Sequence, residues 1–352
     1  MKNKLFIIAA LFALILTGCA KENLETEIEA KPEAQTKAGP KKVTVSVTMT
    51  SPVDNATRVT FSPDSETPHG LIFRWEETDK LLLCYEYNDG TITHYYHGDG
   101  AIKPESISED GKTADFDCII PSDIPTDATF NFYAVYQKTN SDDADGGCFQ
   151  PNTKIYDLEM HESICIRLDN GGGQRGIVRP MLYYSKTNII NTESPALGSI
   201  KLQHAGWIMA IHLKNNTGAE MNLPAFIILA SVYFNYVSNG DGDNSISTTS
   251  FDFSDNTFST GSSDLKNIFL SINKDGNPLS GHKLKADESI IFYRWVATNT
   301  TIPKLLGAIS FSGDDVDQIT STLLPPKTIT FGKVYHIYTT WDGSKFEFSA
   351  RY

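Results

Sequence analysis

From position 41 onward, the chain consists of short segments in which apolar and polar residues alternate. The clearest segment is KKVTVSVTMT, in which every second position is apolar: Val43, Val45, Val47 and Met49. Successive side chains of a strand point to opposite faces of a sheet. The pattern therefore predicts a strand over residues 42–50 with one buried face and one polar face.

Comparable segments follow along the whole chain and are separated by turn signals such as NDG and GDG. They include LIFRW, DKLLLCYEY, TITHYY, TADFDCII, FNFYAVYQ, WIMAIHL and ESIIFYRWV. The last, KFEFSARY, follows an Asp342–Gly343 turn and places four side chains on one face: Phe346, Phe348, Ala350 and Tyr352. Since no segment has convincing helical periodicity, the sequence predicts an all-β fold of antiparallel sandwiches.

The first 18 residues have a different pattern, with two lysines followed by an uncharged apolar run over residues 5–16. A twelve-residue helix spans about 18 Å, well short of a bilayer core of about 30 Å, so the run predicts an export signal. The sequence LTGC then resembles a bacterial lipobox, with signal-peptidase cleavage between Gly18 and Cys19 and a lipid on Cys19. The alternative is a non-acylated signal peptide with an incidental cysteine.

Residues 19–40 contain no aromatic residue and five glutamates, which predicts a flexible acidic tether. The polar stretch KTNIINTESPA is the best candidate for a domain boundary. We therefore expect an N-terminal β-sandwich over 41–190 and a C-terminal β-sandwich over 191–352.

The net charge of the 352 residues is −13, an acidic balance that argues against nucleic acid as a partner. Beyond Cys19 there are four cysteines, Cys84, Cys118, Cys148 and Cys165. An even number in an exported chain permits two disulfides, with buried free thiols as the alternative.

Candidate chemistry is sparse. HYYHGDG brings His94, His97 and Asp99 together in sequence, but residues three apart on a strand point to opposite faces, so we expect no metal site. NGDGDNS resembles the start of a calcium loop, yet Ile246 stands where the sharp turn requires glycine. With no catalytic frame or phosphate-binding loop, the sequence predicts neither an enzyme nor a cofactor.

The order of these features resembles the fimbrillin-like lipoproteins of Bacteroidetes. The resemblance rests on the lipobox, the acidic tether, the first alternating strand, Thr57-Arg58, Trp75, Asp79 and the segment LQHAGWIMAIHLKN. It implies two transthyretin-like β-sandwich domains and a stalk, tip or anchor role in a type V pilus at the outer membrane. Its implied partners are other pilus subunits or further copies, the outer-membrane lipid through Cys19, and a host or bacterial surface ligand.

The same resemblance implies a maturation step in which a protease cuts behind the first strand and an extended segment of another subunit takes that strand's place. Arg58 follows the turn-like SPVDNAT, so cleavage between Arg58 and Val59 is the candidate, with an uncleaved anchor subunit as the alternative. KFEFSARY is the candidate donor strand, or it closes the sandwich of its own chain. A rival function is glycan capture at the cell surface through exposed aromatic side chains such as Tyr95, Tyr96 or Trp341.

Overall fold

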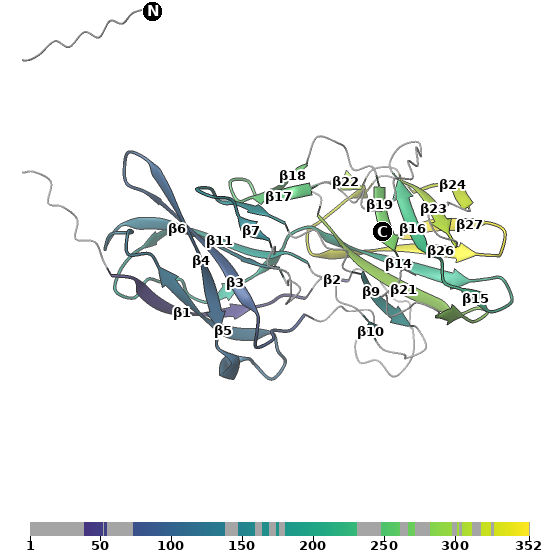
Figure 1. Ribbon diagram of the computed structural model, residues 1–352, viewed down its shortest axis with the longest axis horizontal. Helices are drawn as coiled ribbons and strands as arrows, with labels where there is room; N and C mark the ends of the chain where they lie inside the picture. The colour runs from purple at the N-terminus through teal and green to yellow at the C-terminus, as the bar shows by residue number, and fades with distance from the viewer. Residues whose placement is uncertain are drawn as a thin grey trace, which may run out of the picture. The chain divides into compact units, whose positions relative to one another are not determined.

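The structure is a computed structural model in which strands dominate (Figure 1). It describes residues 39–51, 53–54, 73–137, 147–158, 164–168, 174–175, 180–230, 248–260, 267–271, 282–297, 301–302, 305–311, 318–324 and 327–351. Over these ranges the helical structure is one 3-10 turn, η1 (Pro104–Ser106), and no helix has the length and apolar character needed to cross a bilayer. The predicted all-β class is confirmed.

The first large sheet has eight strands among the described residues. In spatial order they are β12 (Ile200–Lys201), β1 (Lys41–Thr48), β5 (Thr113–Ile120), β4 (Thr93–Ile102), β3 (Lys80–Asn88), β6 (Thr129–Tyr136), β11 (Leu182–Ile190) and β13 (Gln203–His204). Most of its pairs are antiparallel, as predicted, but β1 and β12 run parallel.

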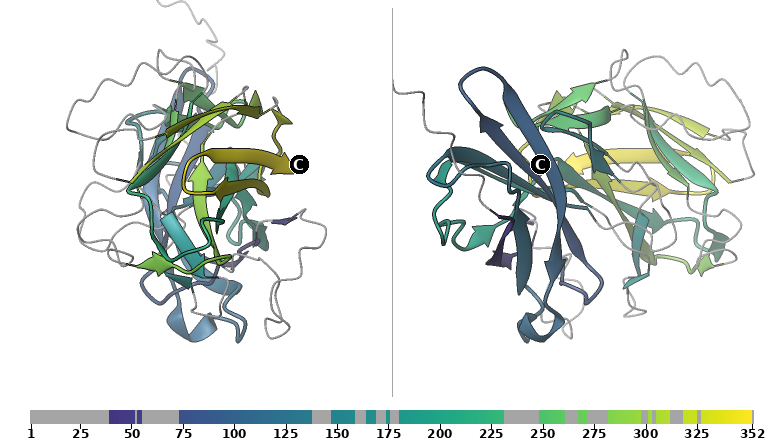
Figure 2. Two further views of the ribbon diagram at one scale, coloured as in Figure 1. Left: turned by 90° about the vertical axis from the view of Figure 1, so that its right-hand side faces the viewer. Right: turned by 60° about the vertical axis from the view of Figure 1, so that its left-hand side comes forward.

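The second large sheet has seven described strands. They are β10 (Gln174–Arg175), β9 (Ile164–Leu168), β21 (Ser289–Val296), β14 (Trp207–Asn215), β26 (Lys333–Trp341), β2 (Val53–Asp54) and β27 (Phe346–Arg351), with both β2 and β27 on the outer side of β26. Figure 2 shows β26 and β27 in yellow, lying side by side as the C-terminal hairpin. β14 and β26 are parallel over eight residue pairs, an arrangement that local alternation does not predict.

Four smaller sheets complete the described structure. Their strands are β7 (Cys148–Phe149), β8 (Ile155–Asp157), β15 (Met221–Asn222), β16 (Phe226–Ala230), β17 (Thr248–Asp252), β18 (Thr257–Thr260), β19 (Asn267–Ser271), β20 (Lys283–Leu284), β22 (Thr301–Ile302), β23 (Leu305–Ser310), β24 (Gln318–Leu324) and β25 (Lys327–Thr328). One of these sheets pairs β8 with β17, so strands far apart in the sequence lie side by side.

A short stretch of chain, residues 200–204, closes the first sheet on itself. Its β12 half pairs with β1, and its β13 half pairs with β11 at the opposite end of the strand order. Residues on both sides of this closure, including Phe116, Phe132 and Leu202, are buried in one apolar cluster. The first sheet therefore surrounds its own core.

Strand pairing crosses the boundary expected at residues 190 and 191. Residues 200–204 join the first sheet, whereas β2, β9 and β10 come from before residue 190 and join the second. A third apolar cluster combines Tyr133 and Tyr183 of the first sheet with Ile208 and Tyr293 of the second. The division into two domains stays a prediction, but the sheets do not follow it residue by residue.

The strand expected over LIFRW is wrong for the described part of that segment, since residues 73–76 lie outside any strand. The indole of Trp75 is buried between Phe116 and Tyr136, with ring centroids 4.8 Å away in both cases. Its backbone N–H donates to the carbonyl oxygen of Gly111 at 2.8 Å. Phe73 and Trp75 therefore pack on the core of the sheet instead of adding a strand.

Candidate functional site

The first strand, β1, buries its apolar face as the alternation predicts. Val45, Val47 and Met49 are each at most 2% exposed, and Val43 is half-buried against the same core. The polar residues between them lie on the other face, where Thr44 Oγ1 donates to Asp117 at 2.8 Å. The strand is one residue longer at its start than expected and ends at Thr48 rather than at residue 50.

Strand β1 pairs fully on one side only. All eight residues pair with β5 in an unbroken antiparallel register, which places Val45 opposite Phe116 and Val43 opposite Cys118. On the other side, the described pairing is limited to Val47 and Thr48 with β12. Among the described residues, the outer backbone of the first six positions therefore has no strand beside it.

Beyond that ladder, three groups from elsewhere in the fold donate to main-chain carbonyl oxygens of residues 47–50. Trp75 Nε1–H donates to the carbonyl of Val47 at 3.3 Å, and the Leu202 backbone N–H donates to that of Thr48 at 3.0 Å. His204 Nε2–H donates to the carbonyl of Thr50 at 2.6 Å. We call these three donors, Trp75, Leu202 and His204, the clasp.

His204 is positioned by the closing segment and its surroundings. It lies in β13 and is 8% exposed, and its ring packs against Phe73 with centroids 5.7 Å apart. Burial lowers the pKa of the His204 imidazole, although its hydrogen bond to Thr50 acts in the opposite direction. A buried neutral imidazole carries one N–H, and the contact to a carbonyl assigns it to Nε2.

The HAGW motif has a structural role next to the clasp. Gly206 has φ +70°, and a Cβ there would lie 2.5 Å from the carbonyl oxygen of Val296. Trp295 Nε1–H donates to the carbonyl of Ala205 at 2.7 Å, and the Gly332 N–H donates to that of Gly206 at 2.8 Å. Glycine is required at position 206 by both conformation and close backbone approach.

The candidate donor strand, β27, pairs with β26 of its own chain, from Trp341 opposite Phe346 to His336 opposite Arg351. The predicted Asp342–Gly343 turn is confirmed, with Gly343 at φ +94° and Asp342 Oδ1 accepting the backbone N–H groups of Ser344 and Lys345. Phe346 is 2% exposed in the core of the second sheet. In this structure KFEFSARY therefore completes the second sheet of its own chain and is not donated to another subunit.

The remaining predicted site residues fall outside what the structure describes. Gly18, Cys19, Arg58, Val59 and Tyr352 lie outside the described residues. For Phe348 and Ala350 only the backbone of β27 is described. Lipidation and cleavage therefore stay predictions, and the NGDGDNS segment is also outside the described residues.

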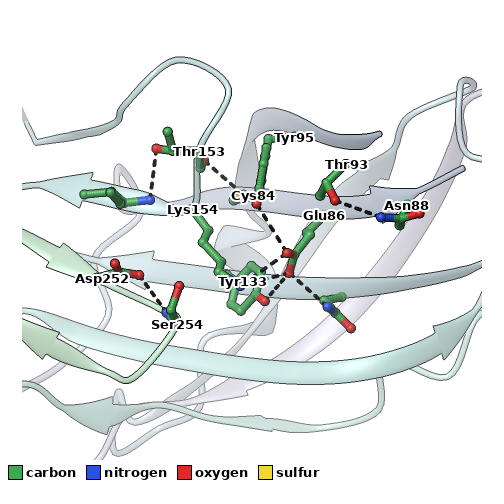
Figure 3. A network of polar contacts seen from close by, with 12 residues as sticks. Cys84, Glu86, Asn88, Thr93, Tyr95, Tyr133, Thr153, Lys154, Asp252 and Ser254 are labelled. Atoms are coloured by element: carbon green, nitrogen blue, oxygen red, sulfur yellow. Dashed lines mark hydrogen bonds and ion pairs between the residues drawn. The ribbon is translucent and has the colours of Figure 1, made fainter. Parts of the chain in front are cut away.

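A polar network that the sequence analysis missed surrounds Glu86 on β3 (Figure 3). The carboxylate accepts hydrogen bonds from Tyr133 Oη at 2.5 Å and Asn131 Nδ2 at 2.9 Å, and Lys154 Nζ lies 3.2 Å away. Burial raises the pKa of Glu86, but the hydrogen bonds and the charge of Lys154 together hold it below its ordinary value. These contacts join β3 and β6 to the loop before β8.

The histidines of HYYHGDG diverge as predicted. His94 Nε2 contacts Asp89 Oδ2 at 2.9 Å and its ring stacks between Tyr87 and Tyr96, whereas His97 Nε2–H donates to the carbonyl of Thr153 at 2.8 Å. In the described part of the chain, no group of three or more histidine, cysteine or acidic residues is arranged to hold a metal ion.

The aromatic side chains considered for glycan capture are all half-buried. Tyr95 Oη donates to Glu86 at 3.4 Å, Tyr96 packs on the core of the first sheet, and Trp341 packs on Phe311 with ring centroids 4.9 Å apart. Over the described residues, the exposed large apolar side chains are Ile92, Ile119 and Ile190, and none is aromatic.

Three of the four candidate disulfide cysteines have free thiols: Cys84 and Cys118 are buried, and Cys148 is exposed. The alternative of two disulfides, which needs all four, is therefore wrong for this structure. Burial raises the pKa of the Cys84 and Cys118 thiols to about 12. Cys118 faces the core beneath β1, whereas Cys84 faces the opposite side of the sheet.

The candidate site is the first strand, β1, which pairs along its whole length with β5 and over only two residues with β12. No protein-family model matches the sequence, and no curated protein does. Among solved structures, a "putative cell adhesion protein" from Bacteroides fragilis is 14% identical and has a TM-score of 0.41, with 87% of this chain and 96% of that chain covered. One of the same description from Bacteroides ovatus is 12% identical, with a TM-score of 0.42 and coverage of 89% and 96%.

A third similar structure is the tip fimbrial protein Mfa3 from Porphyromonas gingivalis with C-terminal truncation, at 10% identity and a TM-score of 0.39, with 89% of this chain and 98% of that chain covered. These three structural neighbours are described as cell adhesion or fimbrial proteins.

Proposed function

We propose that this protein is a cell-surface subunit of a fimbria, acting as stalk, tip or anchor, and that its β1 position can be filled by a strand of another subunit. The observation that carries this proposal is the pairing of β1. Its apolar face is buried, yet only its last two residues have a described strand on the outer side.

In this scheme, cleavage between Arg58 and Val59 separates β1 covalently from the rest of the chain. In the uncut chain, Phe116 is buried and β5 pairs with β1 along its whole length. Loss of β1 would expose both the Phe116 side chain and the backbone of β5. Each buried apolar side chain of β1 contributes about 1.5–3 kcal/mol. An unpaired strand edge beside an apolar core strongly favours an extended segment that restores both.

The donor we propose is the C-terminal segment KFEFSARY of a neighbouring subunit. In its own chain, β27 pairs with β26 and lies at the edge of the second sheet as far as the described strands show. Donation requires β27 to leave that edge and Phe346 to leave its core. Until then, the lipid on Cys19 delivers the precursor to the outer membrane and keeps it there, and an uncut chain stays anchored.

The decisive experiment is N-terminal sequencing of the mature protein isolated from cell-surface material. A chain that begins at Val59 supports strand exchange, and a chain blocked at an acylated Cys19 identifies an anchor or a lipoprotein that does not polymerise. An Arg58→Ala variant is the matched control and should keep the precursor N-terminus.

A second experiment tests the donor. Deletion of residues 345–352 should leave the first sheet folded and abolish multimers. Normal assembly of the truncated chain would exclude KFEFSARY as the donor strand.

A further inference from the structure

The clasp donates its hydrogen bonds to the main chain of the segment that it holds. All three of its hydrogen bonds end on backbone carbonyl oxygens, those of Val47, Thr48 and Thr50. Every residue type presents such a carbonyl, so these contacts do not depend on the sequence of the bound segment. The side-chain requirements come from the core, which takes alternate apolar residues, and from Leu202, whose carbonyl accepts Thr50 Oγ1–H at 2.9 Å.

The clasp is also independent of the strand that it holds. Trp75 precedes β3, and Leu202 and His204 belong to the segment that closes the first sheet. All three residues follow Arg58 in the chain. Cleavage after Arg58 therefore leaves the clasp intact on the larger fragment, together with β5.

The chain leaving the clasp continues to the second sheet. Val53 and Asp54 pair in parallel with Lys333 and Val334 of β26, so residues before the candidate cleavage site belong to both large sheets. The segment from Lys41 to Asp54 is thus held by the β5 ladder, by the clasp and by β26. We call it the N-terminal strap.

We propose that the clasp is a binding site for the backbone of an extended peptide segment, occupied first by the strap and then by the incoming segment of a second subunit. The second occupancy rests on the proposed function. After cleavage, the clasp retains the strap until the incoming segment displaces it. That segment runs antiparallel to β5 and must fill the four positions from Val47 to Thr50 to reach all three donors.

The test uses the chain uncut at Arg58, with a specific protease site inserted between Asp54 and Asn55. After cutting, the labelling rate of the Cys118 thiol reports departure of the strap, because Cys118 lies opposite Val43 and is buried by the same core. Cys84, buried on the other face, reports general unfolding. We expect the cut chain to keep its strap and to label Cys118 slowly.

His204→Leu removes the imidazole donor, and Trp75→Phe removes the indole N–H while keeping an aromatic ring. Each should raise Cys118 labelling in the cut chain roughly tenfold, the factor that corresponds to one buried hydrogen bond of about 1.4 kcal/mol. His204→Gln keeps an N–H donor and should restore slow labelling. His94→Leu, at the β3–β4 hairpin, is the matched control and should leave the rate unchanged.

Equal Cys118 labelling in the cut wild-type, His204→Leu and Trp75→Phe chains would overturn the proposal, as would failure of His204→Gln to restore the slow rate. Immediate loss of the strap from the cut wild-type chain would also overturn it. Because the cut is made at an introduced site, these outcomes do not depend on processing at Arg58. Sequencing of the mature N-terminus decides that question separately.

Discussion

Strands β1 and β11 are the outermost long strands of the first sheet, and each has a short partner on its outer side. Val47 and Thr48 of β1 pair with β12, and Leu182 and Tyr183 of β11 pair with β13. Each therefore leaves most of its outer backbone without a described strand beside it. An edge of this kind can add a strand from another chain, so the two edges invite comparison.

The two edges differ in regularity. β1 follows β5 through eight consecutive pairs, whereas the register of β11 with β6 shifts between Lys186 and Ile189. Asn188, inside that shift, has φ +57°. Lys186 Nζ donates to the carbonyl of Ala196, which places part of the following loop beside the edge. Lys41 Nζ of β1 contacts the same loop, at the carbonyl of Thr192 at 3.0 Å, so the loop does not distinguish the two edges. Bulges discourage strand addition, so β11 is a protected edge and β1 is a regular one.

The largest expected difference between the edges concerns the core beneath them. Val45→Ala with Val47→Ala removes four fully buried methyl groups from β1 and should lower the free energy of unfolding by about 4 kcal/mol. Ile190→Ala on β11 removes a side chain that is 53% exposed and should change it by less than about 0.5 kcal/mol. Urea denaturation of both variants measures the difference, and similar losses would refute the contrast between the edges.

The alternation of residues 43–49 could be predicted because it depends only on neighbouring positions. The divergence of His94 and His97 and the turn at Asp342–Gly343 followed for the same reason. The parallel pairing of β14 with β26 and the closure of the first sheet by residues 200–204 could not, since they join segments far apart in the sequence.

The clasp was missed although its residues lie in segments that the sequence had singled out. Trp75 and the LQHAGW segment were noticed as parts of a family resemblance, which gives no contact between them and β1. Their hydrogen bonds end on backbone carbonyls, so no complementary side chain in residues 47–50 signals them. The role of Asn191 could not be predicted for the same reason, because its buried amide donates to backbone carbonyls, those of Ile124 and Pro125.

The second prediction concerns the loop that follows β11. Asn191 is 1% exposed, and Asn191→Ala leaves two buried carbonyl oxygens without their donor. The free energy of unfolding should fall by about 2 kcal/mol. Asn88→Ala, in the exposed β3–β4 turn, is the matched control and should cost less than half as much. An equal cost at both positions would mean that burial does not distinguish them.

The third prediction tests the bulge that protects β11. Asn188→Ala places a residue with a poorer tolerance for positive φ at +57° and should lower the free energy of unfolding by about 1 kcal/mol. Asn188→Gly accepts that conformation freely and should change it by only a few tenths of a kcal/mol. Thermal denaturation of the two variants separates backbone conformation from side-chain loss. If glycine costs as much as alanine, the bulge does not depend on the left-handed conformation.

An effect as small as that of Asn188→Ala is expected between the two edges, at Glu86 on the central strand β3. Its folded-state pKa is lower than its ordinary value, so its contribution to stability is complete above that value and is lost as the pH falls through the folded-state pKa. Glu86→Gln should therefore cost about 1 kcal/mol at pH 7 and progressively less as the pH falls below the ordinary glutamate pKa, because a protonated glutamate resembles glutamine.

Urea denaturation of both chains at pH 7 and pH 3 measures this convergence, and a cost that stays constant with pH would exclude a charged Glu86 as its source. The same variant sharpens the comparison of the edges. Glu86 contacts Tyr133, Asn131 and Lys154 and not β1, so Cys118 labelling in the chain cut after Asp54 should be unchanged. Faster labelling would mean that retention of the strap depends on the stability of the whole sheet and not on the regular edge and its clasp.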